Sequence, residues 1–163
     1  VDLNCPSTSS MGRMFDAAVG LLGIKSVISY EGQAAMLLEG LAQHYGTILP
    51  LDQGWRIDQG KLDLLPLFAA LADEKKPERG AALFHATLIA ALDDWVRSVA
   101  PGEKMAVGSG GCFSNQILVR GLRTRLGAHG MRLIEARQVP PNDGGLSVGQ
   151  AWVALQHLTA GSR

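Results

Sequence analysis

Apolar residues in the first part of the chain recur at intervals of three and four positions, which is typical of amphipathic helices. A first helix is predicted after a run of Ser and Thr residues, with Ser9 or Ser10 as its N-cap. Its apolar stripe consists of Met11, Met14, Phe15, Ala18 and Leu22. A second helix is predicted to end near Gly46, and its inward positions are Leu37, Leu38, Leu41, Ala42 and Tyr45.

The middle of the chain predicts a hairpin and then the longest helix. Residues 55–57 and 62–64 read as two short strands joined by a turn at residues 58–60. Pro66 opens a short helix that runs through Leu71, and Pro77 opens the longest one, which Pro101 and Gly102 end. The expected inward positions of the long helix are Phe84, Leu88, Ala91, Leu92, Trp95 and Val99. A second apolar row of His85, Ile89 and Val96 indicates burial on two sides.

The pattern changes after Gly102 to strand, glycine loop, helix, strand, loop and helix. The strands are predicted at residues 104–107 and 131–134, and the loops at residues 108–115 and 140–145. The apolar positions of the two helices are Ile117, Leu118, Leu122 and Leu126 in the first and Val148, Ala151, Trp152, Leu155 and Leu158 in the second. This order is typical of an α/β unit with a right-handed crossover. We therefore predict a helix-rich α/β fold with a small sheet, and a single domain over residues 1–163.

Composition and charge exclude some classes of protein and argue against some classes of partner. The chain has 163 residues, 47% of them hydrophobic and 18% charged, so it can bury a core and is not a disordered chain. The formal net charge is zero, which argues against a nucleic-acid partner or an anionic membrane surface. The balance is uneven, because residues 1–100 carry 8 basic and 12 acidic side chains and residues 101–163 carry 7 and 3. The positive excess suits an anionic ligand, although arginines on solvated helix faces explain it equally well.

No apolar stretch is long enough to cross a membrane and no secretory signal is present, so a cytoplasmic location is expected. The chain has two cysteines, Cys5 and Cys112, which are expected to be reduced thiols packed inside the protein. The alternative is a disulfide that joins them across a long loop.

Three segments carry candidate chemistry, each with a plain structural alternative. Ser109, Gly110 and Gly111 lie between a strand and a helix, where the backbone can approach a ligand and the helix offers free N–H groups to an anion. The alternative is a tight turn. Asp143 follows a Pro-Pro pair and could bind a metal ion or cap the last helix.

The third candidate is a patch of small residues on the first two helices. Gly12 lies one turn before Asp16 on the first helix, and Gly32 shares a face with Glu39 on the second. These small residues and carboxylates could hold a ribose or could be solvated. The histidines show no metal-ligand spacing, and His85 is expected to be packed and hydrogen-bonded.

Four segments together resemble a known family. They read TSSMGRMFDAAVGLLG, SYEGQAAMLLEGLA, GSGGCFSN and VPPNDGGLSVGQA. In this order they are similar to the C-terminal part of the Kae1-like domain of HypF, a family of hydrogenase-maturation carbamoyltransferases. The resemblance implies one lobe of an actin/Hsp70-like (ASKHA) fold, in which two lobes clamp a nucleotide and a metal ion.

The resemblance also implies roles for individual residues. Ser109, Gly110, Gly111 and Asn115 would lie against the adenylate of ATP or carbamoyl adenylate. Asp16 would hold the ribose, with Gly32 nearby, and Asp143 would bind the metal ion, iron or zinc. The histidine pair that completes the family's metal site does not occur in this chain. Cys112 stands where the family more often has Val and is expected to pack rather than to react.

The implied activity belongs to a longer, ATP-dependent enzyme. Portions upstream in the family make carbamoyl adenylate from carbamoyl phosphate and ATP. The Kae1-like domain passes the carbamoyl group to the C-terminal cysteine of HypE, on the way to the cyanide ligands of NiFe hydrogenase. The isolated chain, without the N-terminal portion, is expected to be inactive. The alternative is a non-catalytic nucleotide-binding or interaction lobe that acts with a partner chain; a tRNA-modifying enzyme is disfavoured by the zero net charge.

Overall fold

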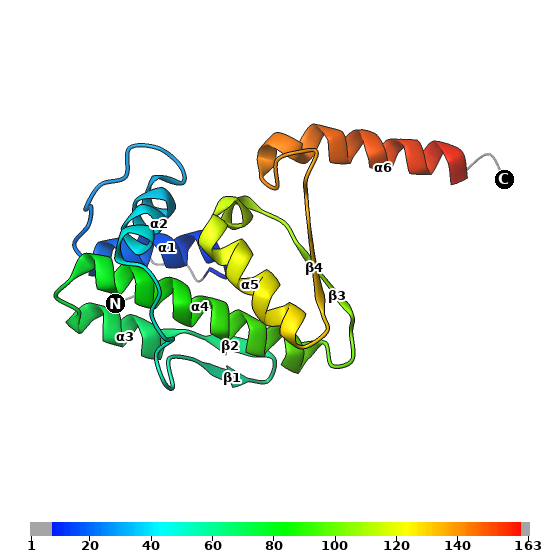
Figure 1. The fold of residues 1–163 in the computed structure, drawn as a ribbon. Coiled ribbons are helices and arrows are strands. Elements are labelled where there is room, and N and C mark those ends of the chain that lie inside the picture. Colours follow the sequence, from blue (N-terminus) through cyan, green and yellow to red (C-terminus); the bar gives the residue numbers. More distant parts are fainter. Residues whose placement is uncertain (1–7, 161–163) are drawn as a thin grey trace.

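The structure, a computed structural model, describes residues 8–160 of the chain. The elements follow the order helix, helix, hairpin, helix, helix, and then strand, helix, strand, helix (Figure 1). The bounds are α1 Met11–Leu21, α2 Gln33–Tyr45, β1 Arg56–Asp58, β2 Lys61–Asp63, α3 Leu65–Asp73, α4 Pro77–Val99, β3 Met105–Gly108, α5 Gln116–Ala128, β4 Arg132–Glu135 and α6 Leu146–Ala160. Two short 3-10 turns precede α5 and α6, namely η1 Gly111–Ser114 and η2 Asp143–Gly145.

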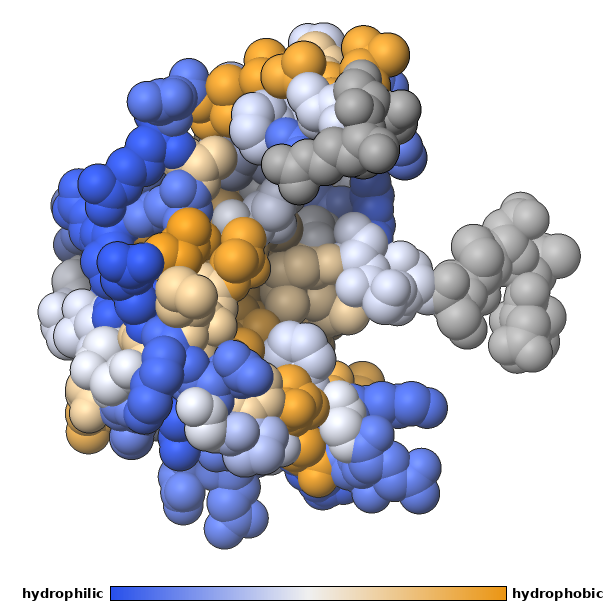
Figure 2. Space-filling model, turned by 90° about the vertical axis from the view of Figure 1, so that its right-hand side faces the viewer, coloured by the Kyte–Doolittle hydropathy of each residue, from blue (hydrophilic) through white to orange (hydrophobic). Residues whose placement is uncertain are grey.

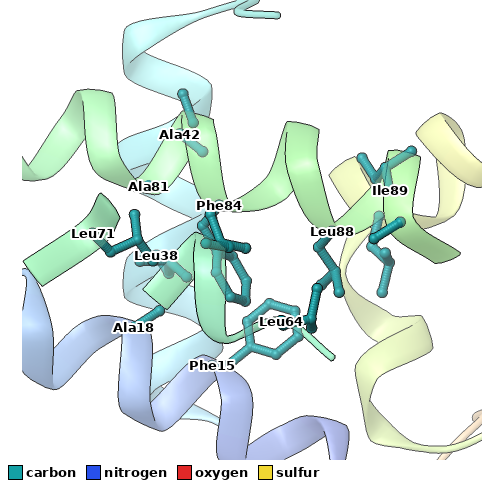
Figure 3. Close-up of a cluster of buried hydrophobic side chains, with 14 of the residues drawn as sticks. Phe15, Ala18, Leu38, Ala42, Leu64, Leu71, Ala81, Phe84, Leu88 and Ile89 are labelled. Carbon is teal, nitrogen blue, oxygen red and sulfur yellow. The ribbon is translucent and has the colours of Figure 1, made fainter. Parts of the chain in front are cut away.

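Helix α4 is the centre of the body, and helices α2, α3 and α5 pack against it. The rings of Phe15 on α1 and Phe84 on α4 meet edge to face with centroids 5.0 Å apart, beside Leu38 and Leu88 (Figure 3). Nearly every side chain of α4 between Gly80 and Ala91 is buried, which confirms the prediction that this helix is covered on two sides. Its last turns are less covered, and Val99 is exposed.

The hairpin of β1 and β2 is fixed onto the C-terminal half of α4. Arg56 pairs with Asp63 in an antiparallel register, and Gln59 and Gly60 in the turn both have positive φ angles, as a two-residue hairpin turn requires. The indole Nε1 of Trp95 donates to the Gly60 carbonyl at 2.7 Å. This bond explains why Trp95 lies half-buried at the edge of the core.

The inward face of α2 differs from the predicted one. Leu37 and Tyr45 are exposed, and the buried row is Ala34, Leu38 and Ala42. These three residues follow one another at intervals of four positions, so they form a single stripe. Two of them are alanines, which let α2 lie close to α4. The predicted face was therefore partly correct, since Leu38 and Ala42 are buried and Leu41 packs against the core.

Strands β3 and β4 pair in parallel, with Met105 opposite Arg132 and Gly108 opposite Glu135. Helix α5, the connection between them, packs against β4. Within residues 8–160 the helix-rich α/β fold therefore has two small sheets, where the sequence predicted one small sheet. Helix α6 forms where it was predicted, but it projects from the body and its apolar stripe is exposed throughout residues 146–159 (Figure 1). No helix within residues 8–160 is long and apolar enough to cross a membrane.

Candidate functional site

The glycine loop between β3 and α5 contains one glycine that packing requires and two that leave space open. A Cβ on Gly108 would overlap the ring of Phe113, so a side chain there would require that ring to move. Gly110 has a φ of 102°, which L side chains rarely adopt, yet nothing lies within 4 Å of the position of its Cβ. Gly111 has open space at the same position and an ordinary φ. Packing therefore does not explain Gly111, which leaves backbone accessible to a ligand.

A hydrogen bond joins this loop to the one that carries Asp143. The Gly110 N–H donates to the Pro141 carbonyl at 2.7 Å. Ser109, Gly110 and Asp143, predicted from separate motifs, consequently line one open groove of about 790 Å³. The other walls of this loop groove are mainly Val139, Pro140, Leu146, Gly149 and Val153.

Asp143 is exposed, and its carboxylate accepts no hydrogen bond from residues 8–160. The neighbouring Asn142 is the capping residue instead, since its Oδ1 accepts from the Gly144 N–H at 3.0 Å. The Asp143 carboxylate is thus available to bind a metal ion or a ligand. Among the described residues no group of three or more His, Cys, Asp or Glu side chains could hold a metal ion, so this part of the chain offers Asp143 as a single ligand and not a complete site.

Asp16, on α1, lies near Cys112 of the glycine loop. Its carboxylate pairs with Arg13 at 2.8 Å and remains partly exposed. Burial raises the pKa of the Cys112 thiol, and the nearby Asp16 charge raises it further. Cys112 is therefore a poor nucleophile at neutral pH, consistent with packing. Cys5 lies outside the described residues.

Asn115 is only 4% exposed, and its side chain already has two protein partners. Its Oδ1 accepts from the Leu118 N–H at 2.9 Å, and its Nδ2 donates to Nε2 of His85 at 3.0 Å. The Nδ1–H of His85 donates to the Ala81 carbonyl at 2.8 Å, the tautomer that this network requires. Burial lowers the pKa of His85, which keeps the ring neutral. His85 is packed and hydrogen-bonded as predicted, and Asn115 holds the start of α5.

The start of α5 is not free for an anion, contrary to the expectation from the sequence. Oε1 of Glu39 accepts from the N–H groups of Gln116 at 2.7 Å and Ile117 at 3.4 Å. The Leu118 N–H bonds the Asn115 side chain, and the Val119 N–H bonds the Asn115 carbonyl at 3.1 Å. The orphan donors that a helix start usually offers are therefore satisfied. Nothing in the local sequence could reveal this role of Glu39, which lies 77 positions before Gln116.

The donors that remain near the loop are the N–H groups of Gly111 and Cys112, which bond no group in residues 8–160. Gly32 is the left-handed N-cap of α2 and is exposed. It precedes Glu39 by seven residues, or about 10 Å along the helix. Neither Asp16 nor Gly32 lines the loop groove, in contrast to Ser109, Gly110 and Asp143.

The positive charge of the last third gathers elsewhere, along β4. A second groove of about 910 Å³ is lined by Arg123, Arg132 and Arg137, with Glu135 paired to Arg123. It contains neither the glycines of the loop nor Asp143. The charge bias therefore does not point to the loop groove.

Comparison with known proteins places this chain among the carbamoyltransferases. Residues 1–150 match the family described as carbamoyltransferase, Kae1-like domain, second subdomain. The chain belongs to the HypF family of hydrogenase-maturation carbamoyltransferases, which confirms the resemblance seen in the sequence.

Curated relatives are similar over nearly the whole chain. Carbamoyltransferase HypF2 of Cupriavidus necator is 49% identical over 94% of this chain and 23% of its own length. A carbamoyltransferase HypF homolog of the same organism is 44% identical, over 97% of this chain and 43% of its length. HypF of Rhizobium leguminosarum is 41% identical, over 93% of this chain and 20% of its length. The chain thus spans between a fifth and less than half of these relatives.

Two solved structures share the fold. Full-length HypF in its phosphate- and nucleotide-bound form superposes with a TM-score of 0.75 at 32% identity, over 92% of this chain and 21% of that one. HypF of T. kodakarensis has the same TM-score at 25% identity, over 93% and 20% of the two chains. A protein with this fold therefore occurs with phosphate and nucleotide bound.

Proposed function

We propose that this chain is the nucleotide-binding lobe of a HypF-type, ATP-dependent carbamoyltransferase with an ASKHA-like architecture. The whole enzyme would pass a carbamoyl group from carbamoyl adenylate, made from carbamoyl phosphate and ATP, to the C-terminal cysteine of a HypE-type acceptor. The product would supply the cyanide ligands of NiFe hydrogenase. The observation that carries the proposal is the loop groove, where Ser109 and Gly110 face Asp143 beside a glycine that packing does not need.

The residues would divide the binding of the adenylate between them. Its phosphate would lie along Gly110 and Gly111 and accept from the open N–H groups of Gly111 and Cys112. The Asp16 carboxylate would accept hydrogen bonds from the ribose hydroxyls. Asn115 would act by holding the loop against α5, because its amide already bonds Leu118 and His85.

Asp143 would contribute one ligand to an iron or zinc ion, with the remaining ligands supplied from outside this chain. A free, exposed carboxylate is a suitable donor for either ion. Such an ion, when bound, neutralises negative charge and polarises the carbonyl group that reacts.

A second candidate is a nucleotide-binding or interaction lobe that has no transferase activity of its own and works with a separate partner chain. This second candidate is favoured by the absence, within residues 8–160, of a group of three or more His, Cys, Asp or Glu side chains that could hold a metal ion. The two candidates differ in whether a joined N-terminal portion restores carbamoyl transfer.

Titration of the chain with ATP, followed by amide chemical shifts, tests the binding role that both candidates share. We expect shifts confined to residues 12–16, 109–115 and 142–145, because these segments surround the glycine loop. Affinity should be on the order of millimolar, about 4 kcal/mol, since one lobe makes only part of the contacts. Shifts centred elsewhere, or micromolar affinity, would show that the nucleotide site is misplaced.

A further inference from the structure

A groove outside the proposed nucleotide site concentrates positive charge. This arginine groove, which measures about 910 Å³, is lined by Arg123, Arg132, Arg137 and the other residues of β4. Glu135, the acidic residue in its lining, is already paired with Arg123. Arg132 and Arg137 are exposed, and neither forms an ion pair within residues 8–160. The groove therefore carries two positive charges that no described carboxylate balances.

The same groove contains the outer edge of β4. The N–H of Arg132 donates to the Lys104 carbonyl at 2.8 Å, so Arg132 and, two positions on, Ile134 direct their backbone groups toward β3. Leu133 and Glu135 consequently direct theirs to the other side, where residues 8–160 place no strand. A strand edge with free N–H and C=O groups is a template for pairing with another extended chain.

Arginines flank this edge on both faces of the sheet. On one face α5 packs against β4, and Arg123 of that helix reaches Glu135. On the other face the Arg132 guanidinium lies 3.7 Å from Sδ of Met105, whose side chain is exposed. An extended chain beside β4 would direct its side chains alternately to these two faces. Acidic side chains on the open face would therefore meet Arg132.

The arginine groove is separate from the other surfaces of this side of the molecule. Figure 2 shows the side on which β3, β4 and α6 lie in Figure 1, with apolar residues gathered at the top, where α6 projects, and hydrophilic residues at the bottom. The lining residues of the groove all lie between positions 123 and 139. They therefore include neither α6 nor the glycine loop nor Asp143.

We propose that the arginine groove binds an acidic, extended segment of a partner protein, which adds to the edge of β4 as a further strand. This inference goes beyond the proposed function and does not depend on it. Main-chain hydrogen bonds to Leu133 and Glu135 would supply affinity, and carboxylates paired with Arg132 and Arg137 would supply specificity.

Two other anionic ligands fit the groove less well. A nucleic acid is disfavoured because no aromatic side chain lines the groove for base stacking, and because residues 1–100 carry an acidic excess. A single phosphate would fill little of a groove of about 910 Å³ and would leave the strand edge unpaired. The combination of free strand edge and unbalanced arginines thus favours an acidic peptide segment.

A synthetic peptide with alternating glutamates, acetyl-Glu-Thr-Glu-Val-Glu-Thr-Glu-amide, tests the proposal on the 163-residue chain. At saturating peptide, we expect the amides of Leu133 and Glu135 to exchange hydrogen at least about tenfold more slowly, because these amides would gain a strand partner. The amides of Arg132 and Ile134, which already face β3, should change little. Two further peptides carry N-methyl groups on one or the other set of alternate amides. One of them should lose binding and the other should retain it.

Substitution of the unbalanced arginines tests the charged part of the site. Arg132→Gln combined with Arg137→Gln should weaken binding of the peptide about tenfold, since two exposed ion pairs are lost. Arg56→Gln combined with Arg120→Gln is the matched control, because it removes the same charge from two exposed arginines outside the groove. The control should weaken binding by about twofold or less, since salt screens distant surface charges.

Five results would overturn the proposal. Equal weakening by the two double variants would mean that net charge alone attracts the peptide. Unchanged exchange at Leu133 and Glu135, or equal binding of both methylated peptides, would mean that no strand is added. Tighter binding of a seven-nucleotide oligothymidine than of the peptide would assign the groove to nucleic acid. In a full-length protein that carries this chain, slow exchange of these two amides without peptide would show that another part of the same protein covers the edge. Protection that grows with protein concentration would show that a second copy covers it.

Discussion

At the scale of single residues, the site depends on a buried polar network between α4 and α5. His85 and Asn115 satisfy each other's hydrogen-bonding groups, and both are almost fully buried. The rings of Phe15 and Phe84 lie against the imidazole at centroid distances of 5.8 Å and 5.5 Å. A buried polar pair of this kind is stabilising only while every group keeps its partner. Protonation of His85 would remove the Nε2 acceptor and with it the hydrogen bond from Asn115.

The free energy of unfolding should fall as the pH decreases below about 6.5. Burial lowers the pKa of His85 from its ordinary value of 6.5, with the Glu39 charge opposing it in part. The unfolded chain then takes up a proton that the folded chain does not, so stability falls as the pH drops from 6.5 to the folded pKa. Urea unfolding at several pH values measures this. The His85→Gln variant should lose the pH dependence, and His44→Gln, an exposed position on α2, should keep it. An equal slope in all three proteins would contradict the assignment.

Glu39 should contribute to stability as a cap supplied by another helix. Its carboxylate bonds two N–H groups at the start of α5, where the helix dipole also favours negative charge. Glu39→Ala should lower the free energy of unfolding by about 1–2 kcal/mol, the usual cost of losing an N-cap partner. Chemical denaturation checks this against Glu31→Ala, an exposed carboxylate before α2 whose loss should change little. Equal effects of the two substitutions would show that the Glu39 bonds contribute nothing.

At the scale of elements, the sequence predicted each α-helix and strand of residues 8–160 and most of the buried positions of α1, α4 and α5, but it misplaced part of the inward face of α2 and did not foresee that the stripe of α6 is exposed. The helix boundaries followed from single residues. Proline marks the starts of α3 and α4, and glycine marks the end of α2. The predicted inward face of α2 was right for Leu38 and Ala42, which are buried, and wrong for Leu37 and Tyr45, which are exposed. The predicted free helix start at α5 was also wrong, since Glu39 comes from a distant segment. Local patterns specify where a helix forms, whereas such contacts depend on tertiary packing.

The two accessible glycines of the loop should respond differently to alanine. Gly110→Ala places a side chain at a φ of 102°, which should cost more than about 1 kcal/mol of stability. Gly111→Ala meets open space and an ordinary φ, so stability should hardly change. Its methyl group would nevertheless project toward the proposed nucleotide, and ATP binding should weaken. Thermal unfolding and ATP titration of both variants separate these effects. Normal ATP binding by the Gly111→Ala variant would show that Gly111 does not contact the nucleotide.

At the scale of the whole molecule, the structure is a packed body with an uncovered side. The core around α4 is continuous from α1 to β4, so the body does not need further residues to bury its apolar side chains. The uncovered surfaces are those of α6 and of β3 and β4. The sequence could indicate the family from ordered motifs, but it could not show this asymmetry, because the apolar positions of α6 look like those of any core helix.

The isolated chain should therefore bind nucleotide weakly and transfer no carbamoyl groups. Incubation with carbamoyl phosphate, ATP and a HypE-type acceptor, followed by mass spectrometry of the acceptor's C-terminal cysteine, tests this. Residues 8–160 contain no group of three or more His, Cys, Asp or Glu side chains that could hold a metal ion, whereas a metal site needs three or four protein ligands. Appreciable modification of that cysteine by the chain alone would contradict the prediction.

In a full-length protein that carries this chain, Asp143→Ala should separate the two halves of the reaction. The Asp143 carboxylate bonds no group in the part of the chain that the structure describes, so its removal should leave the free energy of unfolding within about 0.5 kcal/mol of the parent. Metal content and carbamoyl transfer should fall sharply, while formation of carbamoyl adenylate, assigned to upstream portions, should continue. Asn142→Ala is the matched control, because it removes the cap of η2 and should cost about 1 kcal/mol without removing a metal ligand. If Asp143→Ala keeps normal metal content and transfer, Asp143 is not the ligand. If Asn142→Ala loses transfer as completely as Asp143→Ala does, the shape of the loop, and not the carboxylate, is what the reaction requires.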